Sequence, residues 1–144
     1  MGNSLGTNLV IETEPKPEDV RLLKDRIYKF NAQATGIADG KLFAVLLSDD
    51  NGATIGGIYC WTWGATCYVR YLYVPAHLRT QGHGSGLMGT VEVTARERGC
   101  AQIVLETHEF QAPEFYRRLG FEVTGCVEGY PHGHQCLTMV KLLT

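Results

Sequence analysis

Apolar and polar positions follow two periods along this chain, one typical of helices and one typical of strands. A short apolar segment at residues 8–12 predicts a first strand, and apolar side chains then recur at helical spacing, which predicts a helix over residues 17–34. Three apolar and aromatic segments predict strands at 41–48, 53–61 and 66–74. Asn51 and Gly52 separate the first two of these. Because both residues tolerate positive φ angles, we expect a type I′ hairpin there.

The second half of the chain alternates helices with strands. Helices are expected at 84–98 and 113–119, and strands at 101–106, 121–127 and 135–142. The complete order, β-α-β-β-β-α-β-α-β-β, predicts an α/β (α+β) fold, in which a mixed, mostly antiparallel sheet of about seven strands carries helices on both faces. We expect residues 1–144 to form a single domain in which residues 1–7 are flexible.

The composition is that of a globular protein and narrows the classes of function. Of the 144 residues, 44% are hydrophobic and 19% are charged, and a net charge of -2 gives no basic surface for nucleic acid or for an anionic membrane. The sequence contains neither an apolar run of membrane-spanning length nor a secretory signal pattern. Five cysteines without a C-x-x-C pair indicate reduced thiols, so we expect a cytoplasmic protein. His132 and His134 lack a third clustered ligand, so no metal site is expected.

Four glycines fall within residues 82–89, at the start of the helix expected at 84–98. From Gly84 onward they match the dinucleotide fingerprint G-x-G-x-x-G, with Glu106 about twenty residues further on as a ribose ligand. That fingerprint belongs directly after the first strand of a mostly parallel sheet, whereas here hairpins precede it and residues 75–79 intervene. Gly89 falls inside the helix, where we expect it to allow close packing. The pattern therefore disfavours a dinucleotide site.

From Gln81 onward the same stretch is Gln-Gly-His-Gly-Ser-Gly. Successive unpaired N–H groups at a helix N-terminus can hold a pyrophosphate, and glycine lets the phosphates approach the backbone closely. We expect these N–H groups to extend from Gly82 to Gly86. The candidate phosphate-binding residues are Gln81, Gly82, His83, Gly84, Ser85 and Gly86. Arg79, two residues earlier, is expected to contact a phosphate or solvent.

A second motif, Ala-Pro-Glu-Phe-Tyr-Arg-Arg-Leu-Gly-Phe, occupies residues 112–121, about thirty residues after the glycines. The two motifs resemble the signatures Q/R-x-x-G-x-G/A and A-x-x-F-Y-x-x-x-G-F of the GNAT superfamily of N-acetyltransferases, and the resemblance extends over residues 8–143. It implies the GNAT fold, acetyl-CoA as cosubstrate, and acetyl transfer to an amine by direct attack without a covalent enzyme intermediate.

The resemblance also implies a cosubstrate site. The strands at 66–74 and 101–106 are expected to splay apart at their ends, and pantetheine is expected to pair there with the backbone. The backbone groups concerned are those of Leu72, Tyr73 and Val74. Gln111 stands where relatives often have an asparagine that contacts pantetheine. Tyr116 matches the family's tyrosine, whose phenol can protonate the departing thiolate or hydrogen-bond its sulfur.

The general base is less well defined by the resemblance. Many relatives carry a glutamate or histidine in the strand before the glycines, and residues 67–74 contain neither. Glu106 and His108 at the end of the next strand are the candidates, either directly or through water. A substrate amine that arrives deprotonated would need no base.

The acceptor site is indicated by aromatic residues on two adjoining strands, Tyr59, Trp61, Trp63 and Tyr68, which either form core or line a pocket for an amine. The loop at 128–134 is typical of a lid. We expect a small-molecule primary amine as acceptor, and dimers are common in the family. The alternatives are N-acetylation of a protein or peptide, and an acyl-CoA-binding module without turnover, which the missing strand carboxylate favours.

Overall fold

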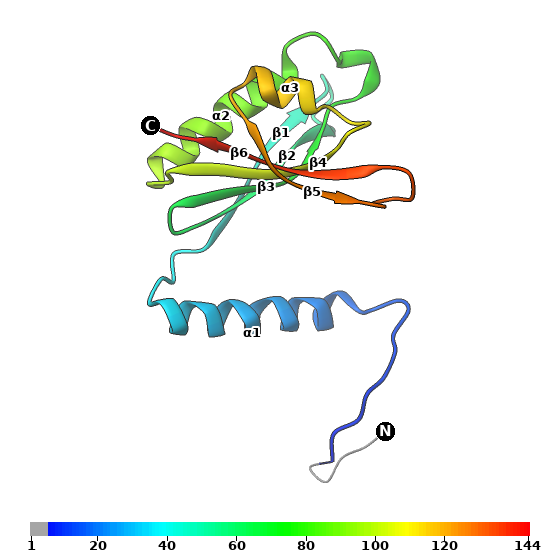
Figure 1. Cartoon of the computed structure of the whole chain (residues 1–144), viewed down its shortest axis with the longest axis vertical. Coiled ribbons are helices and arrows are strands. Elements are labelled where there is room, and N and C mark those ends of the chain that lie inside the picture. Colours follow the sequence, from blue (N-terminus) through cyan, green and yellow to red (C-terminus); the bar gives the residue numbers. More distant parts are fainter. Residues whose placement is uncertain (1–5) are drawn as a thin grey trace. The chain divides into compact units, whose positions relative to one another are not determined.

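The computed structural model describes residues 6–144 and divides the chain into two compact units, Met1–Ala38 and Asp39–Thr144. The first unit contains helix α1, Pro17–Thr35 (Figure 1). Pro17 is the first helical residue, Glu18 and Asp19 lie at the positive end of the helix dipole, and Gly36 ends the helix with a φ of 73°. The helix predicted at 17–34 is confirmed. Most of the segment predicted to be flexible, 1–7, lies outside the described residues.

Residues 8–12 form no strand, so that prediction was wrong. The segment is irregular, and its apolar side chains are exposed; Ile11 is 92% exposed. A strand is stabilised by ladder hydrogen bonds to a neighbour, and the short apolar pattern at 8–12 says nothing about whether such a neighbour exists. Among residues 6–144 the sheet accordingly has six strands, not about seven.

The second unit is built around one mixed sheet in the order β1-β2-β3-β4-β6-β5, in which only the β3–β4 pair is parallel. This confirms the mixed, mostly antiparallel architecture. The elements are β1 (Lys41–Ser48), β2 (Thr54–Trp63), β3 (Thr66–Tyr73), a short 3-10 helix (Ala76–Leu78), α2 (His83–Glu97), β4 (Gln102–His108), α3 (Pro113–Arg118), β5 (Glu122–Glu128) and β6 (Gln135–Leu142).

The turn between β1 and β2 differs from the predicted type I′ hairpin. Gly52 has a φ of 82°, but Asn51 does not have a positive φ, as a type I′ turn would require. The carboxylate of Asp49 accepts hydrogen bonds from the backbone N–H groups of Asn51 and Ala53, each at 2.9 Å. This local capping by Asp49 holds Asn51 in an ordinary conformation, and only Gly52 adopts the left-handed one.

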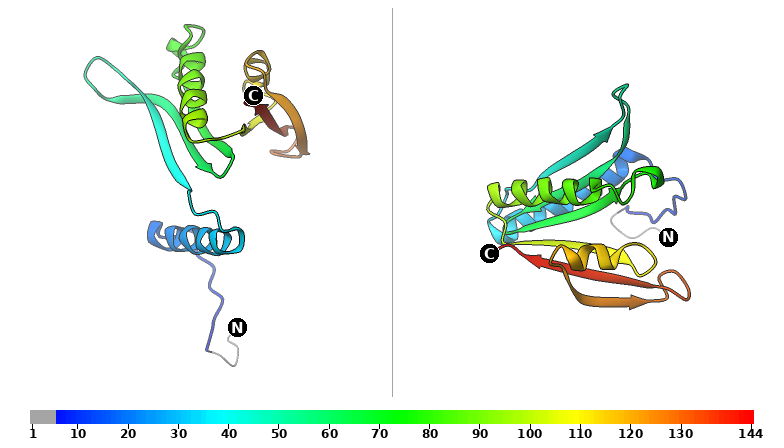
Figure 2. Two further views of the ribbon diagram at one scale, coloured as in Figure 1. Left: turned by 90° about the vertical axis from the view of Figure 1, so that its left-hand side faces the viewer. Right: turned by 90° about the horizontal axis from the view of Figure 1, so that it is seen from above.

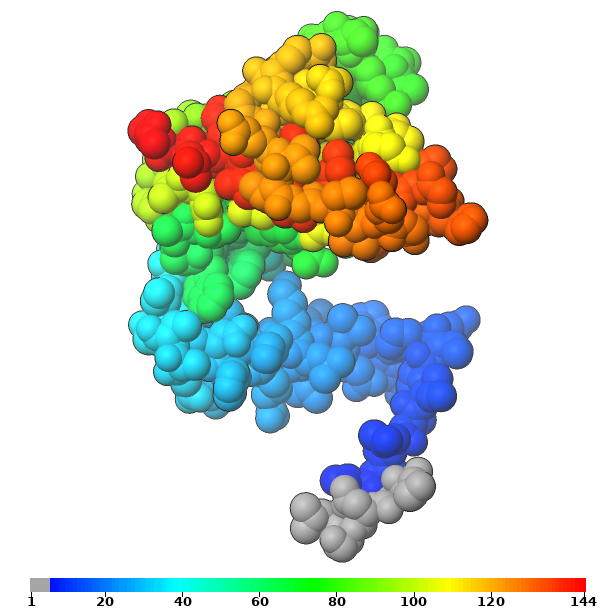
Figure 3. All heavy atoms as spheres, in the orientation of Figure 1, coloured from blue at the N-terminus to red at the C-terminus, as the bar shows by residue number. Residues whose placement is uncertain are grey.

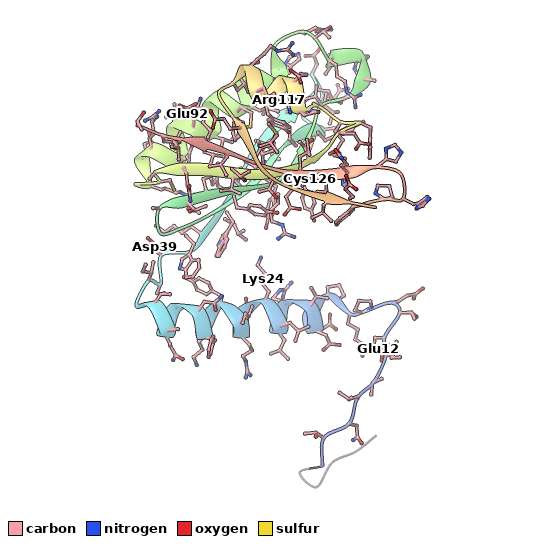
Figure 4. The ribbon with its side chains drawn as sticks, in the orientation of Figure 1. Glu12, Lys24, Asp39, Glu92, Arg117 and Cys126 are labelled. Carbon is pink, nitrogen blue, oxygen red and sulfur yellow. The ribbon has the colours of Figure 1, made fainter. Side chains whose placement is uncertain are left out.

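The hydrophobic core lies between the sheet and the helices α2 and α3, which cover the same face (Figure 2). This helical face carries Cys67, Val69, Ile103 and Leu105, all buried against the apolar side of α2. Glu92 of α2, labelled in Figure 4, ties the helix to β6 through Lys141, whose Nζ lies 2.9 Å from its carboxylate. The predicted helical cover is thus confirmed for one face. The sheet's other face is called the second face below.

Helices α1, α2 and α3 all fall short of what a membrane span requires in length or apolar character, and no other α-helix occurs among residues 6–144.

Candidate active site

A gap opens in the centre of the sheet where its two parallel strands diverge. Strands β3 and β4 pair from Thr66 with Gln102 to Val69 with Leu105, and pairing stops there. Strand β3 nevertheless continues to Tyr73 and β4 to His108. Figure 2 shows the two halves of the sheet meeting at one end and separating toward the other. The predicted splaying is therefore present, and it leaves backbone groups of both strands without ladder partners.

Helix α2 begins beside this gap with its first N–H groups pointing out of the helix. Gly82 is the N-cap with a φ of 85°, a conformation that suits glycine. The N–H of Gly86 donates to the carbonyl of Gly82 at 3.0 Å, so the expected run of unpaired N–H groups ends one residue earlier than predicted. The groups of Gly82, His83, Gly84 and Ser85 are the four that lack an intrahelical partner.

Gly84 brings the two sequence motifs together. A Cβ built at Gly84 would lie 3.1 Å from Cζ of Phe115 in α3, whereas one at Gly82 or Gly86 would meet no atom within 4 Å. A side chain at Gly84 would therefore press on α3, and those at Gly82 and Gly86 would occupy the open space in front of the helix. Gly89 behaves differently from the prediction, since a Cβ there also meets nothing within 4 Å. Gly89 is not a close-packing site.

Tyr116 lies in α3 on the helical face and is only 8% exposed. Its ring makes edge contacts with Phe115 and Phe121, at centroid distances of 5.1 and 5.8 Å. Burial raises the pKa of Tyr116 to about 12, so the phenol keeps its proton at neutral pH. In Figure 3, the atoms of α3 adjoin those of β5, the edge strand of the sheet that follows it in the chain.

Arg79 and Gln81 brace the loop between β3 and α2. The Nε of Arg79 donates to the carbonyl of Val74 at 2.9 Å, and its guanidinium lies 6.0 Å from the ring of Tyr73. The amide of Gln81 donates to the carbonyl of His77 at 3.0 Å. The side chains of Leu72 and Val74 pack against the core, whereas that of Tyr73 is 57% exposed.

Glu106 lies on the second face at the gap, where two side chains hold its carboxylate. The hydroxyl of Tyr68 in β3 donates to one oxygen at 3.0 Å, and the thiol of Cys136 in β6 donates to the other at 3.6 Å. Partial burial, followed by the contact with Glu106, raises the pKa of Tyr68, so its hydroxyl remains a donor. This cluster stands across the sheet from Tyr116, because Leu105 and Glu106 point to opposite faces.

His108 and Gln111 lie beyond the end of the gap and are held by hydrogen bonds. The Nδ1 of His108 lies 2.8 Å from the carbonyl oxygen of Tyr130. Because a carbonyl only accepts, Nδ1 carries the proton, and the lone pair of a neutral ring is on Nε2. The Oε1 of Gln111 accepts from the N–H of His108 at 2.7 Å and from the hydroxyl of Thr107 at 3.3 Å. The amide nitrogen Nε2 of Gln111 therefore remains available to donate hydrogen bonds to a ligand.

The predicted lid at 128–134 is tied to the loop after β4. The carboxylate of Glu109 lies 2.6 Å from Nδ1 of His134 and accepts from the N–H of Gln135 at 3.1 Å. The ring of Phe110 packs between those of His108 and His134, at 5.2 and 5.0 Å. These contacts fix the position of the hairpin tip next to His108.

Known proteins resemble this chain in sequence and in fold. A family model described as an acetyltransferase (GNAT) domain matches residues 39–123. The chain belongs to the GNAT acetyltransferase family. This confirms the family indicated by the two motifs, and the protein is therefore an acyltransferase.

Individual relatives agree with this assignment. The GNAT chain is 35% identical to blasticidin-S acetyltransferase of Streptomyces morookaense over 107 residues, which cover 72% of this chain and 76% of that protein. It is 28% identical to an acetyltransferase of Agrobacterium fabrum over 134 residues, covering 93% and 98%. A solved structure from Agrobacterium tumefaciens superposes with a TM-score of 0.85 at 26% identity, covering 95% of this chain and 100% of that one.

Two residues of the candidate site, Cys136 and Arg70, were not among the predicted ones. Cys136 contacts Glu106 from β6, and no sequence signal marks that contact. Arg70 lies next to the gap in a β-bulge, and for this residue a signal exists. The tyrosines of β3 lie at positions 68, 71 and 73, so the spacing of two residues that is typical of one strand face is interrupted by an extra residue near Arg70. A β-bulge produces this interruption.

Proposed function

We propose that this protein is an acetyl-CoA-dependent N-acetyltransferase that moves an acetyl group to the primary amine of a small molecule by direct attack. The gap between β3 and β4 carries the proposal. On the helical face it adjoins the N-terminus of α2 and Tyr116, and on the second face it adjoins Glu106. A cosubstrate on one face and an amine on the other can thus meet through the sheet.

The residues on the helical face fit acetyl-CoA, which supplies an activated thioester and a thiol leaving group. The N–H groups from Gly82 to Ser85 can bind the pyrophosphate, and the space in front of Gly82 and Gly86 is what a side chain would fill. The edge of β3 near Leu72 and Tyr73 lacks partners toward β4 and can pair with the amide groups of pantetheine. The Nε2 of Gln111 is a further donor for the same arm.

Tyr116 provides the proton for the leaving group. Its hydroxyl has no hydrogen-bond partner among the described protein groups, and its raised pKa keeps it neutral. A neutral phenol next to a departing thiolate can donate its proton or stabilise the charge by a hydrogen bond. The buried ring contacts with Phe115 and Phe121 hold the hydroxyl in one position.

Glu106 receives the acceptor amine on the second face. Its carboxylate attracts the ammonium form and takes up the proton lost when nitrogen attacks the carbonyl carbon, directly or through water. Tyr68 and Cys136 orient the two oxygens. The Nε2 lone pair of His108 can pass the proton on to solvent.

A small-molecule acceptor agrees with the relative named for blasticidin S, and the tied hairpin tip encloses one side of the site. The five free thiols, four of them buried, agree with a reducing compartment such as the cytoplasm.

A thiol-release assay with acetyl-CoA and a panel of primary amines tests the proposal. We expect turnover on at least one amine, and a decrease in kcat/KM of about a hundredfold in Glu106→Gln. Glu122→Gln, which removes an exposed carboxylate from β5, is the matched control and should leave the rate unchanged. Binding of acetyl-CoA without turnover on any amine would contradict the proposal and favour a sensing role.

A further inference from the structure

A β-bulge places Arg70 at the opening of the gap. Tyr59 pairs with Tyr71 and Cys60 with Val69, so Arg70 is an extra residue without a partner in β2. It directly follows Val69, the last residue of β3 that pairs with β4. Bulges redirect side chains near functional sites. Here the bulge brings a cation to the place where the acceptor would enter.

The guanidinium of Arg70 is held by aromatic rings. Its Cζ lies 5.9 Å from the ring of Tyr68 and 5.7 Å from that of Tyr71. The salt bridges found among residues 6–144 do not include Arg70. A side-chain hydrogen bond with Tyr71 raises the pKa of Arg70 and occupies part of the guanidinium. Its remaining N–H donors can bind a planar anion.

Tyr68 links this cation to the carboxylate of Glu106. The face of its ring lies against Arg70, and its hydroxyl donates to Glu106. Arg70 and Glu106 form no ion pair with each other, so both charges remain available on the same face of the sheet. Two fixed and separated opposite charges are complementary to a molecule that carries both an ammonium and an anionic group.

We propose that the acceptor is an amino-acid-like molecule, whose carboxylate binds Arg70 while its amine faces Glu106 at the gap. This inference rests on the proposed N-acetyltransferase function. It adds that the enzyme recognises a carboxylate at a set distance from the reacting amine, with Tyr68 as the spacer that fixes that distance.

A substrate series with a variable spacing between the two charges tests this inference. The acceptors are ω-amino acids from glycine to ε-aminocaproate, each compared with its own carboxamide in the thiol-release assay. The native protein should prefer one chain length and should favour the acid over the matched amide by about tenfold or more in kcat/KM, the range expected for one charge-assisted contact.

Variants of Arg70 show whether that preference depends on the guanidinium. In Arg70→Gln the ratio of acid to amide should fall to about one, and in Arg70→Lys it should be partly retained. Arg118→Gln removes the same charge from an exposed position in α3 and should keep the native ratio. An unchanged KM for acetyl-CoA in each variant reports an intact fold and cosubstrate site.

The outcomes separate the two proposals. Turnover without any preference for the acid, or a preference that survives in Arg70→Gln, would overturn the carboxylate inference and leave N-acetylation standing. If Arg70→Gln raised the KM for acetyl-CoA by the same factor by which it lowered kcat/KM for the amino acids, the carboxylate inference would also be overturned. Arg70 would then bind the cosubstrate and not the acceptor. Absence of turnover on acids, amides and other amines would overturn the proposed function itself.

Discussion

The environment of Tyr116 supports its proposed role as the proton donor. Burial is the cause that raises its pKa, and its ring is fixed by Phe115 and Phe121. A phenol of this kind is a proton donor throughout the physiological range and is ill suited to act as a base.

Tyr116→Phe should lower kcat by at least about tenfold with little change in the KM for acetyl-CoA, because only the hydroxyl is removed. The steady-state assay measures this directly. An unchanged kcat would exclude Tyr116 from the chemistry.

The same variant has a signature in stability. The pKa of Tyr116 rises from 10.0 to about 12 on folding, so below pH 10 both states are protonated and the residue adds no pH dependence. Between pH 10 and 12 the unfolded state ionises first, and this residue should lower the free energy of unfolding by about 2 kcal/mol. In Tyr116→Phe this decrease in the free energy of unfolding between pH 10 and 12 should be absent, as measured by denaturant titrations at each pH. An equal decrease in the native protein and the variant would contradict the burial of the Tyr116 hydroxyl.

At the scale of the element, helix α2 carries glycines with different roles. Gly84 faces Phe115 at 3.1 Å, whereas Gly89 is exposed and has open space around it. Gly84→Ala should displace α3 and raise the KM for acetyl-CoA by about tenfold, the cost of a weakened contact to a charged group. Gly89→Ala, the matched control on the same helix, should raise the free energy of unfolding by about 0.5 to 1 kcal/mol and leave that KM unchanged. Equal effects of the two changes on acetyl-CoA would contradict the phosphate-binding assignment.

Elements with a long, regular pattern could be predicted from the sequence, and those that depend on a partner could not. The three α-helices and the six strands between residues 17 and 142 were each predicted to within two residues at either end, because each coincides with an apolar segment that is bounded by turn-forming or capping residues. The strand predicted at 8–12 does not form. A strand needs a hydrogen-bonding partner in a sheet, and the local sequence does not show whether one exists. The turn at Asn51 is not of the predicted type I′, because hydrogen bonds to the carboxylate of Asp49 determine its conformation.

The candidate site shows the same division. The local sequence placed the glycines at the start of α2, because helix starts have local signals. Tyr116 was singled out only by the resemblance to the GNAT signature, since the burial of its ring depends on packing between distant elements. The contacts of Glu106 with Tyr68 and Cys136 join three strands that lie far apart along the chain, and no local pattern could indicate them. Arg70 could be predicted in part. The spacing of the tyrosines at 68, 71 and 73 indicates the bulge, but it does not indicate which side chains surround the guanidinium of Arg70.

At the scale of the whole molecule, the divergence of β3 and β4 is the feature on which the account depends. The gap adjoins both the helical face, with α2 and Tyr116, and the second face, where Glu106 and Arg70 lie. A sheet paired along its full length would separate these groups. In the proposed mechanism, the ladder hydrogen bonds that β3 and β4 do not form beyond Val69 and Leu105 leave room for the cosubstrate and the amine to meet.

The most direct test of this account is a crystal structure of the protein with coenzyme A bound. We predict electron density for the pyrophosphate at the N–H groups from Gly82 to Ser85, for pantetheine along the β3 edge of the gap, and for the thiol beside the hydroxyl of Tyr116. Density for coenzyme A away from the gap, or with its thiol remote from Tyr116, would contradict the account.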